Sequence, residues 1–164
     1  MWYRSCPLKK ICSPTFDKMN VQILPKTGVV PAGKSLTVAN KLKLLLLGNN
    51  PIELGAIYDT LHTHEHSGCR FEVDVCFRAN DCVRKYRKSF YDCLIIDDTI
   101  PEYQIQQVLD KINAVRLAPV PAMLLKSDNF RSFCLKGIYE FFLKKEISLT
   151  SLSCSIFRSM NFAK

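Results

Sequence analysis

At 164 residues, with 48% apolar and 23% charged side chains, the chain has the composition of one globular domain and not of a disordered or fibrous protein. Its net charge of +8 comes mostly from residues 1–43, which hold eight Lys or Arg against Asp17 alone, whereas residues 44–164 hold fifteen against fourteen acids. No apolar run has the length of a transmembrane helix or a signal peptide, which predicts a cytoplasmic protein without a membrane span.

Residues 1–40 are predicted to form a basic extension with little structure of its own, because prolines and glycines interrupt every local pattern. A solvated tail is favoured over a nucleic-acid-binding arm. Within it, "GVVPAGKS", Gly28–Ser35, matches the phosphate-binding pattern G-x-x-x-x-G-K-[ST]. The motif follows "PKT" instead of a buried strand and runs into "LTVANKLK" instead of a long helix, which favours a chance match. A P-loop NTPase remains the second alternative.

From Lys41 onward, strand and helix patterns alternate. The run "LKLLLLG" predicts a strand buried on both faces, followed by a turn with Asn50 as N-cap and Pro51 in the first turn of a helix. That helix is predicted to place its apolar side chains on one face: Ile52, Ala56, Ile57 and Leu61.

Four further strand–helix steps follow the first. Strands are predicted over 71–77, 92–98, 119–125 and 138–143, and helices over 81–90 with Asn80 as N-cap, 102–115, 129–137 with Gly137 as C-cap, and 148–160. Five strands alternating with five helices predict an α/β, doubly wound (βα)5 fold of the flavodoxin-like type. This is a three-layer sandwich with a parallel sheet in the order 2-1-3-4-5.

Polar side chains follow the predicted strands. Since ligands of such sheets bind where the carboxyl ends of the strands meet, these side chains are the candidate site. They are Asn49, Asn50, Asp97, Asp98, Lys126, Ser127 and Lys144.

Two stretches carry a family resemblance over residues 41–164. "DCLIIDDTIP" ends a buried strand in Asp97 and has Pro101 four residues later, and "GIYEFFLKKE" ends the last strand in Lys144. In these features the chain resembles the receiver domain of bacterial two-component response regulators. The resemblance implies that Asp97 is the phospho-acceptor position and Lys144 the conserved-lysine position.

The chain departs from that family at the positions that bind metal and switch. Gly48 and Asn49 stand where the family has an acidic pair, and Lys145 stands where it has a proline after the conserved lysine. The residues at the family's switch positions are Lys126, Ser127 and Phe141. Since phosphoryl transfer to a carboxylate needs a divalent cation, the loss of two anionic ligands argues against phosphorylation of Asp97. No cofactor is expected, and any Mg²⁺ would bind weakly through Asp97 and Asn49. Lys126 could partly stand in for the metal, and Asp98 is predicted to point away from Asp97.

These features predict a stand-alone, degenerate receiver-like (pseudo-receiver) module that acts through a partner protein and is not an enzyme. The partner would be a histidine kinase or a downstream signalling protein, and the last helix could form a homodimer. A functional phospho-accepting receiver is the first alternative. The pocket is expected to be metal-free and held by an Asp97–Lys144 salt bridge with Asn49 nearby. The segments 129–137 and 138–143 and the last helix would form the docking surface.

Three other patterns are assigned structural roles. The eight cysteines include no C-x-x-C pair and are predicted to be buried thiols. "HTHEH", with His62, His64 and His66, is predicted to be a solvated turn and not a zinc site. "VRKYRKSFY" predicts an amphipathic helix with Val83, Tyr86 and Phe90 inside and its charges in water, which argues against nucleic acid as a partner.

Overall fold

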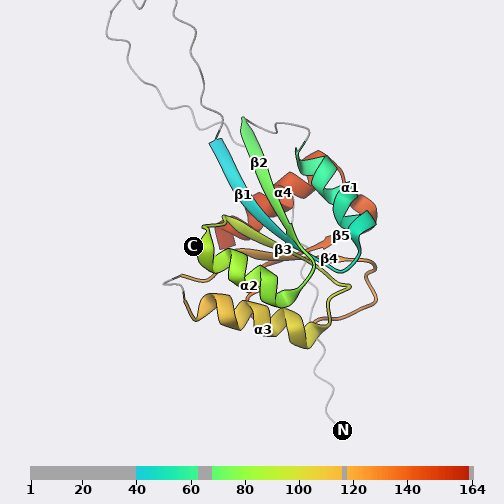
Figure 1. Ribbon diagram of the computed structural model, residues 1–164. Helices are drawn as coiled ribbons and strands as arrows, with labels where there is room; N and C mark the ends of the chain where they lie inside the picture. Colours follow the sequence, from blue (N-terminus) through green and yellow to red (C-terminus); the bar gives the residue numbers. More distant parts are fainter. Residues whose placement is uncertain (1–39, 63–67, 116–117, 163–164) are drawn as a thin grey trace, which may run out of the picture. The chain divides into compact units, whose positions relative to one another are not determined.

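Five parallel strands form one sheet in the order β2-β1-β3-β4-β5 in the computed structural model, which describes residues 40–62, 68–115 and 118–162 (Figure 1). This confirms the predicted sheet. In chain order the elements are β1 Asn40–Leu47, α1 Pro51–His62, β2 Cys69–Cys76, α2 Ala79–Lys88, β3 Cys93–Asp97, α3 Glu102–Asn113, β4 Ala122–Lys126, β5 Glu140–Leu143, the 3-10 turn η1 Lys144–Glu146 and α4 Leu149–Phe162.

Helices cover both faces of the sheet, so its central strands are buried on both sides. Leu44–Leu47 of β1 are fully buried, and their side chains alternate between two cores. One core contains apolar side chains of α1 and α4, and the other contains those of α2 and α3 (Figure 1). Because all four strand pairs are parallel, the carboxyl ends of the five strands lie at one edge of the sheet.

The helix predicted over 129–137 is absent, so the described residues contain four α-helices instead of five. Side chains of α3 bind the backbone of this segment: Glu102 Oε1 accepts from the Cys134 amide at 2.8 Å and Gln106 Oε1 accepts from the Lys136 amide at 2.9 Å. Phe133 and Leu135, two residues apart, both pack on the core, as in an extended chain. Side chains of α3 therefore accept from backbone amides of this segment that would bond to carbonyls four residues earlier in a helix.

Four smaller predictions about helix faces and ends are also wrong. Ile52 is 83% exposed and Ala56 is also outside, because α1 turns Leu54, Ile57 and Leu61 toward the core. The N-cap of α2 is Arg78 and not Asn80, Phe90 is 66% exposed beyond the end of α2, and Gly137 lies in a turn with φ of 90° and caps no helix.

Candidate functional site

Asp97 and Lys144 form the ion pair that the sequence predicts. Asp97 is the last residue of β3 and is fully buried, and Lys144 follows β5 directly. The Lys144 Nζ donates to Asp97 Oδ1 at 3.0 Å and lies 2.9 Å from Oδ2. Because β4 lies between β3 and β5, the lysine side chain reaches across the end of β4. Asp97 Oδ1 also accepts from the Thr99 amide at 2.8 Å.

Asp98 belongs to the same cluster, which contradicts the expectation that it points away from Asp97. Its Oδ1 lies 3.2 Å from Lys144 Nζ. The Ser127 amide and hydroxyl also donate to its two carboxylate oxygens, each at 2.8 Å. The alternation of side chains holds only within a strand, and β3 ends at Asp97. The chain turns there, so both carboxylates reach one ammonium.

Glu53 is a third carboxylate of the cluster and is not among the predicted site residues. Its Oε2 lies 2.6 Å from Lys144 Nζ. Asn50, which caps α1 by accepting from the Ile52 amide at 3.1 Å, donates to Glu53 Oε1 at 3.0 Å and so orients this side chain. The available signal was that Glu53 lies in the first turn of α1, directly after a strand end.

Gly48, the residue after β1, leaves no room for a side chain beside Asp97. A Cβ at this position would lie 2.8 Å from the Asp97 Cβ and 2.8 Å from a methyl carbon of Leu54. Neither position of the lost acidic pair points to Asp97, because Asn49 donates from its backbone and side-chain amides to Thr99, each at 3.3 Å. Asn49 thus links the loops after β1 and β3.

The three switch positions separate into two groups. Ser127 holds Asp98, as described above. The Lys126 ammonium lies 5.8 Å from the ring centroid of Phe133 and 6.0 Å from that of Phe141, which is 47% exposed. Within the described residues Lys126 forms no ion pair, so the cation that contacts the carboxylates is Lys144 and not the expected Lys126.

The three carboxylates keep Lys144 charged. Burial by itself lowers the pKa of Lys144, but hydrogen bonds to Glu53 and Asp97 outweigh it, so the pKa is raised. For Asp98, burial raises the pKa, yet the Ser127 donors and Lys144 outweigh that effect and the pKa is lowered. Both shifts favour the charged forms, so the ion pair of Lys144 with Asp98 persists across the neutral pH range.

The residues of this cluster do not fit a Mg²⁺ centre in their present arrangement. Mg²⁺ requires a near-octahedral set of oxygen ligands. Gly48 has no room for a ligand side chain, and the Lys144 ammonium lies between the carboxylates of Asp97, Asp98 and Glu53. No group of three His, Cys, Asp or Glu in the part that the structure describes could hold a metal ion.

The other motifs lie apart from this site or outside the described residues. Gly28–Ser35, His64 and His66 belong to the latter, and the described His62 stacks on Tyr58 with centroids 5.0 Å apart. Among the six described cysteines, all free, Cys134 and Cys154 are exposed, contrary to the prediction. Cys76, Cys82 and Cys93 are buried as predicted, and burial raises the pKa of Cys93 to about 12.

Several solved structures similar to this chain are receiver domains of signalling proteins. The response regulator domain of Thermotoga maritima CheB has 15% identity and a TM-score of 0.58 over 74% of this chain and 98% of its own. The receiver domain of an HD domain-containing protein from Pseudomonas fluorescens Pf-5 has 11% identity and a TM-score of 0.58 over 76% and 98%.

A third structure is the complex of the Saccharomyces cerevisiae phosphotransfer protein Ypd1 with the receiver domain of Ssk1, at 19% identity and a TM-score of 0.55 over 77% and 94%. At these identities the comparisons show that the chain has the receiver fold. No family model matches the chain, and no curated protein matches it. No helix of the described residues is long and apolar enough to cross a bilayer.

Proposed function

We propose that this chain is a receiver-like signalling module of a two-component phosphorelay. In it, a fixed ion-pair cluster takes the place of the metal-dependent phosphorylation site. One observation carries the proposal: the Lys144 ammonium lies within 3.2 Å of carboxylate oxygens of Asp97, Asp98 and Glu53. The module acts in the cytoplasm by binding a partner protein, without a cofactor and without turning over a substrate.

The cluster opposes phosphorylation in two ways. An attacking carboxylate needs a free oxygen and a nearby cation that accepts charge from the phosphoryl group. Both oxygens of Asp97 face Lys144 and the side chain is buried, so an incoming phosphodonor would first have to displace the lysine. A switch also requires two states of similar free energy, and the ion pairs stabilise one of them.

The docking surface consists of the segments 129–137 and 138–143, the second of which contains β5, and of α4. Phe130 is 97% exposed and Phe141 is 47% exposed. Lys126 and the Arg131 guanidinium both lie over the ring of Phe133. Exposed rings beside cations suit a partner surface that is apolar and acidic. The complex of Ypd1 with the receiver domain of Ssk1 supports a histidine phosphotransfer protein or kinase as the type of partner.

A functional phospho-accepting receiver is the second candidate, and the carboxylate count favours it. Asp97, Asp98 and Glu53 already converge on one cation, as they would on Mg²⁺ if Lys144 moved away. The two candidates differ in whether a metal and a phosphoryl analogue can open the cluster.

The decisive experiment is a titration of the full chain with Mg²⁺, with and without beryllofluoride, followed by ¹⁵N NMR. We expect no saturable shift around Asp97 at millimolar Mg²⁺ and no change at Phe141. Incubation with acetyl phosphate and Mg²⁺ should add no acid-labile phosphoryl group. Saturable shifts that spread to Phe141, together with a phosphoryl group that the Asp97→Asn variant lacks, would establish the phospho-accepting receiver instead.

The P-loop alternative has its own test. An NTPase would hydrolyse nucleotide and lose that activity in Lys34→Ala, whereas we expect no hydrolysis by either protein.

Partner binding is measured by calorimetry with a histidine phosphotransfer protein, comparing Phe130→Ser with the wild-type chain. Equal affinity of both for that protein would exclude this docking surface.

A further inference from the structure

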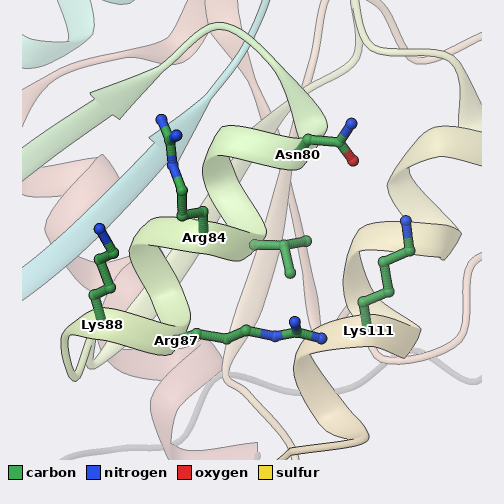
Figure 2. Close-up of a pocket in the computed structure, with 6 residues that line it drawn as sticks. Asn80, Arg84, Arg87, Lys88 and Lys111 are labelled. Carbon is green, nitrogen blue, oxygen red and sulfur yellow. The ribbon is translucent and has the colours of Figure 1, made fainter.

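A hollow between α2 and α3 is lined by basic side chains. It has a volume of about 480 Å³, and its lining residues are Asn80, Val83, Arg84, Arg87, Lys88 and Lys111. Arg84, Arg87 and Lys88 project from α2 and Lys111 from α3 (Figure 2). The hollow shares no residue with the cluster around Lys144.

The charge of this hollow is largely unbalanced within the described residues. Arg84 pairs with Asp81 at 2.9 Å, but no carboxylate lies within ion-pair distance of Arg87, Lys88 or Lys111 in the part of the chain that the structure covers. The nearest acid in sequence to Lys111, Asp110, accepts from Gln106 at 2.8 Å. Cations that converge from two helices repel one another unless an anion lies among them.

Helix-end electrostatics explain only part of this pattern. Basic residues in the last turn of a helix interact favourably with its negative end, and Arg87, Lys88 and Lys111 all lie in last turns. Yet none of the three donates a hydrogen bond to a terminal carbonyl among the described residues. In Figure 2 the Arg87 side chain extends from α2 toward the helix that carries Lys111. The dipole accounts for the basic residue type but not for this convergence.

We propose that this hollow is a binding site for a soluble polyphosphate anion. Guanidinium groups bind phosphate oxygens in pairs, and lysines add point charges. The volume lies within the range of small-molecule sites and leaves room for more than one phosphate group. Arg84 to Lys88 span only about 6 Å of helix rise, so the basic side chains of α2 start from one short stretch and not from a long track. A compact ligand therefore fits better than a nucleic acid backbone.

The test uses the full chain and sodium tripolyphosphate, with calorimetry and ¹⁵N NMR. The Arg87→Glu/Lys111→Glu variant is compared with Arg70→Glu/Lys136→Glu, which changes the net charge equally at exposed positions elsewhere. We expect saturable one-to-one binding with shifts at the ends of α2 and α3. Affinity for tripolyphosphate should fall about tenfold or more in Arg87→Glu/Lys111→Glu, because charge-assisted contacts are lost, and less than about twofold in the control variant. Arg87→Gln/Lys111→Gln repeats the comparison if the first variant unfolds.

Four results would overturn the proposal. Equal weakening in both double variants would show that net charge alone attracts the anion, and absent or scattered shifts would show that no site exists. If a fluorescein-labelled oligouridylate binds more tightly than tripolyphosphate, and Arg87→Glu/Lys111→Glu loses this binding, the hollow would be a nucleic-acid site. Stronger association with vesicles containing a phosphoinositide than with free tripolyphosphate would assign it to a membrane surface.

Discussion

The molecule contains two groups of charges with opposite balance. At the carboxyl ends of the strands, Lys144 meets three carboxylates, and its side chain and that of Asp97 are 14% and 1% exposed. Between α2 and α3, four exposed cations meet one carboxylate within ion-pair distance in the described part of the chain. Burial makes an unpaired charge costly, so the first group is closed on itself, whereas water screens the second and leaves it free to bind an anion.

Removal of Lys144 should have the largest effect. Lys144→Met leaves Asp97 and Asp98 buried without their cation, so the free energy of unfolding should fall by about 3–5 kcal/mol. Urea denaturation at pH 7 measures this loss. The neighbouring exposed Lys145→Met, which breaks no ion pair among the described residues, should change stability by less than about 0.5 kcal/mol. A loss below about 1 kcal/mol in Lys144→Met would show that the cluster contributes no more to stability than an exposed ion pair does.

Restoring an acid at position 48 should fail. Gly48→Asp places a Cβ 2.8 Å from the Asp97 Cβ, so stability should fall by about 1–3 kcal/mol and Mg²⁺ affinity should not rise. The control is Gly55→Ala in α1, where an added Cβ meets no atom within 4 Å, and which should gain about 0.5–1 kcal/mol. Saturable Mg²⁺ binding by Gly48→Asp without loss of stability would show that the cluster opens easily.

The cluster should lose stability in acid through Asp98. Its pKa is lowered by folding, so its contribution is present above the unfolded value of about 3.9 and is lost as pH falls through the folded pKa. The raised pKa of Lys144 acts oppositely: its contribution is present below about 10.4 and is lost only as pH rises through the folded pKa.

Urea denaturation between pH 2 and pH 7 in roughly unit steps should therefore show a smaller acid loss for Asp98→Asn than for the wild type. The control is Glu146→Gln, because the Glu146 carboxylate is exposed and forms no ion pair among the described residues. If the unfolding free energies of Asp98→Asn and the wild type fall equally with decreasing pH, carboxylates other than Asp98 cause the loss of stability in acid.

The groove cations should have the smallest effect on stability. Arg87→Gln/Lys88→Gln removes two exposed charges without described ion pairs, so the unfolding free energy should stay within about 0.5 kcal/mol. Any gain should appear at low salt and vanish at high salt, because only repulsion is relieved. Denaturation at two salt concentrations measures this, and a loss that persists at high salt would contradict the view that these charges are free.

The resemblance and the apolar patterns predicted the parts of the site that lie on the strands. β1 and β3 are continuous apolar runs, so their ends could be located, and with them Asp97 and Gly48. Lys144 followed in the same way from the end of β5. Glu53 and Asp98 were missed or misplaced, because one lies on a helix and the other beyond a strand end, where no fixed period relates a side chain to the sheet.

The sequence by itself determined the number and the parallel direction of the strands, because apolar segments separated by helix-length connections favour parallel pairing with covered faces. Only the tertiary structure decided the course of the segment between β4 and β5. There Glu102 and Gln106 of α3 take the amide hydrogens that a helix would have used. It also decided that Arg87 and Lys111, which are remote in sequence, line the hollow between α2 and α3. Local patterns determine which elements form, whereas the pairing of charges depends on which side chains the folded chain brings within a few ångströms.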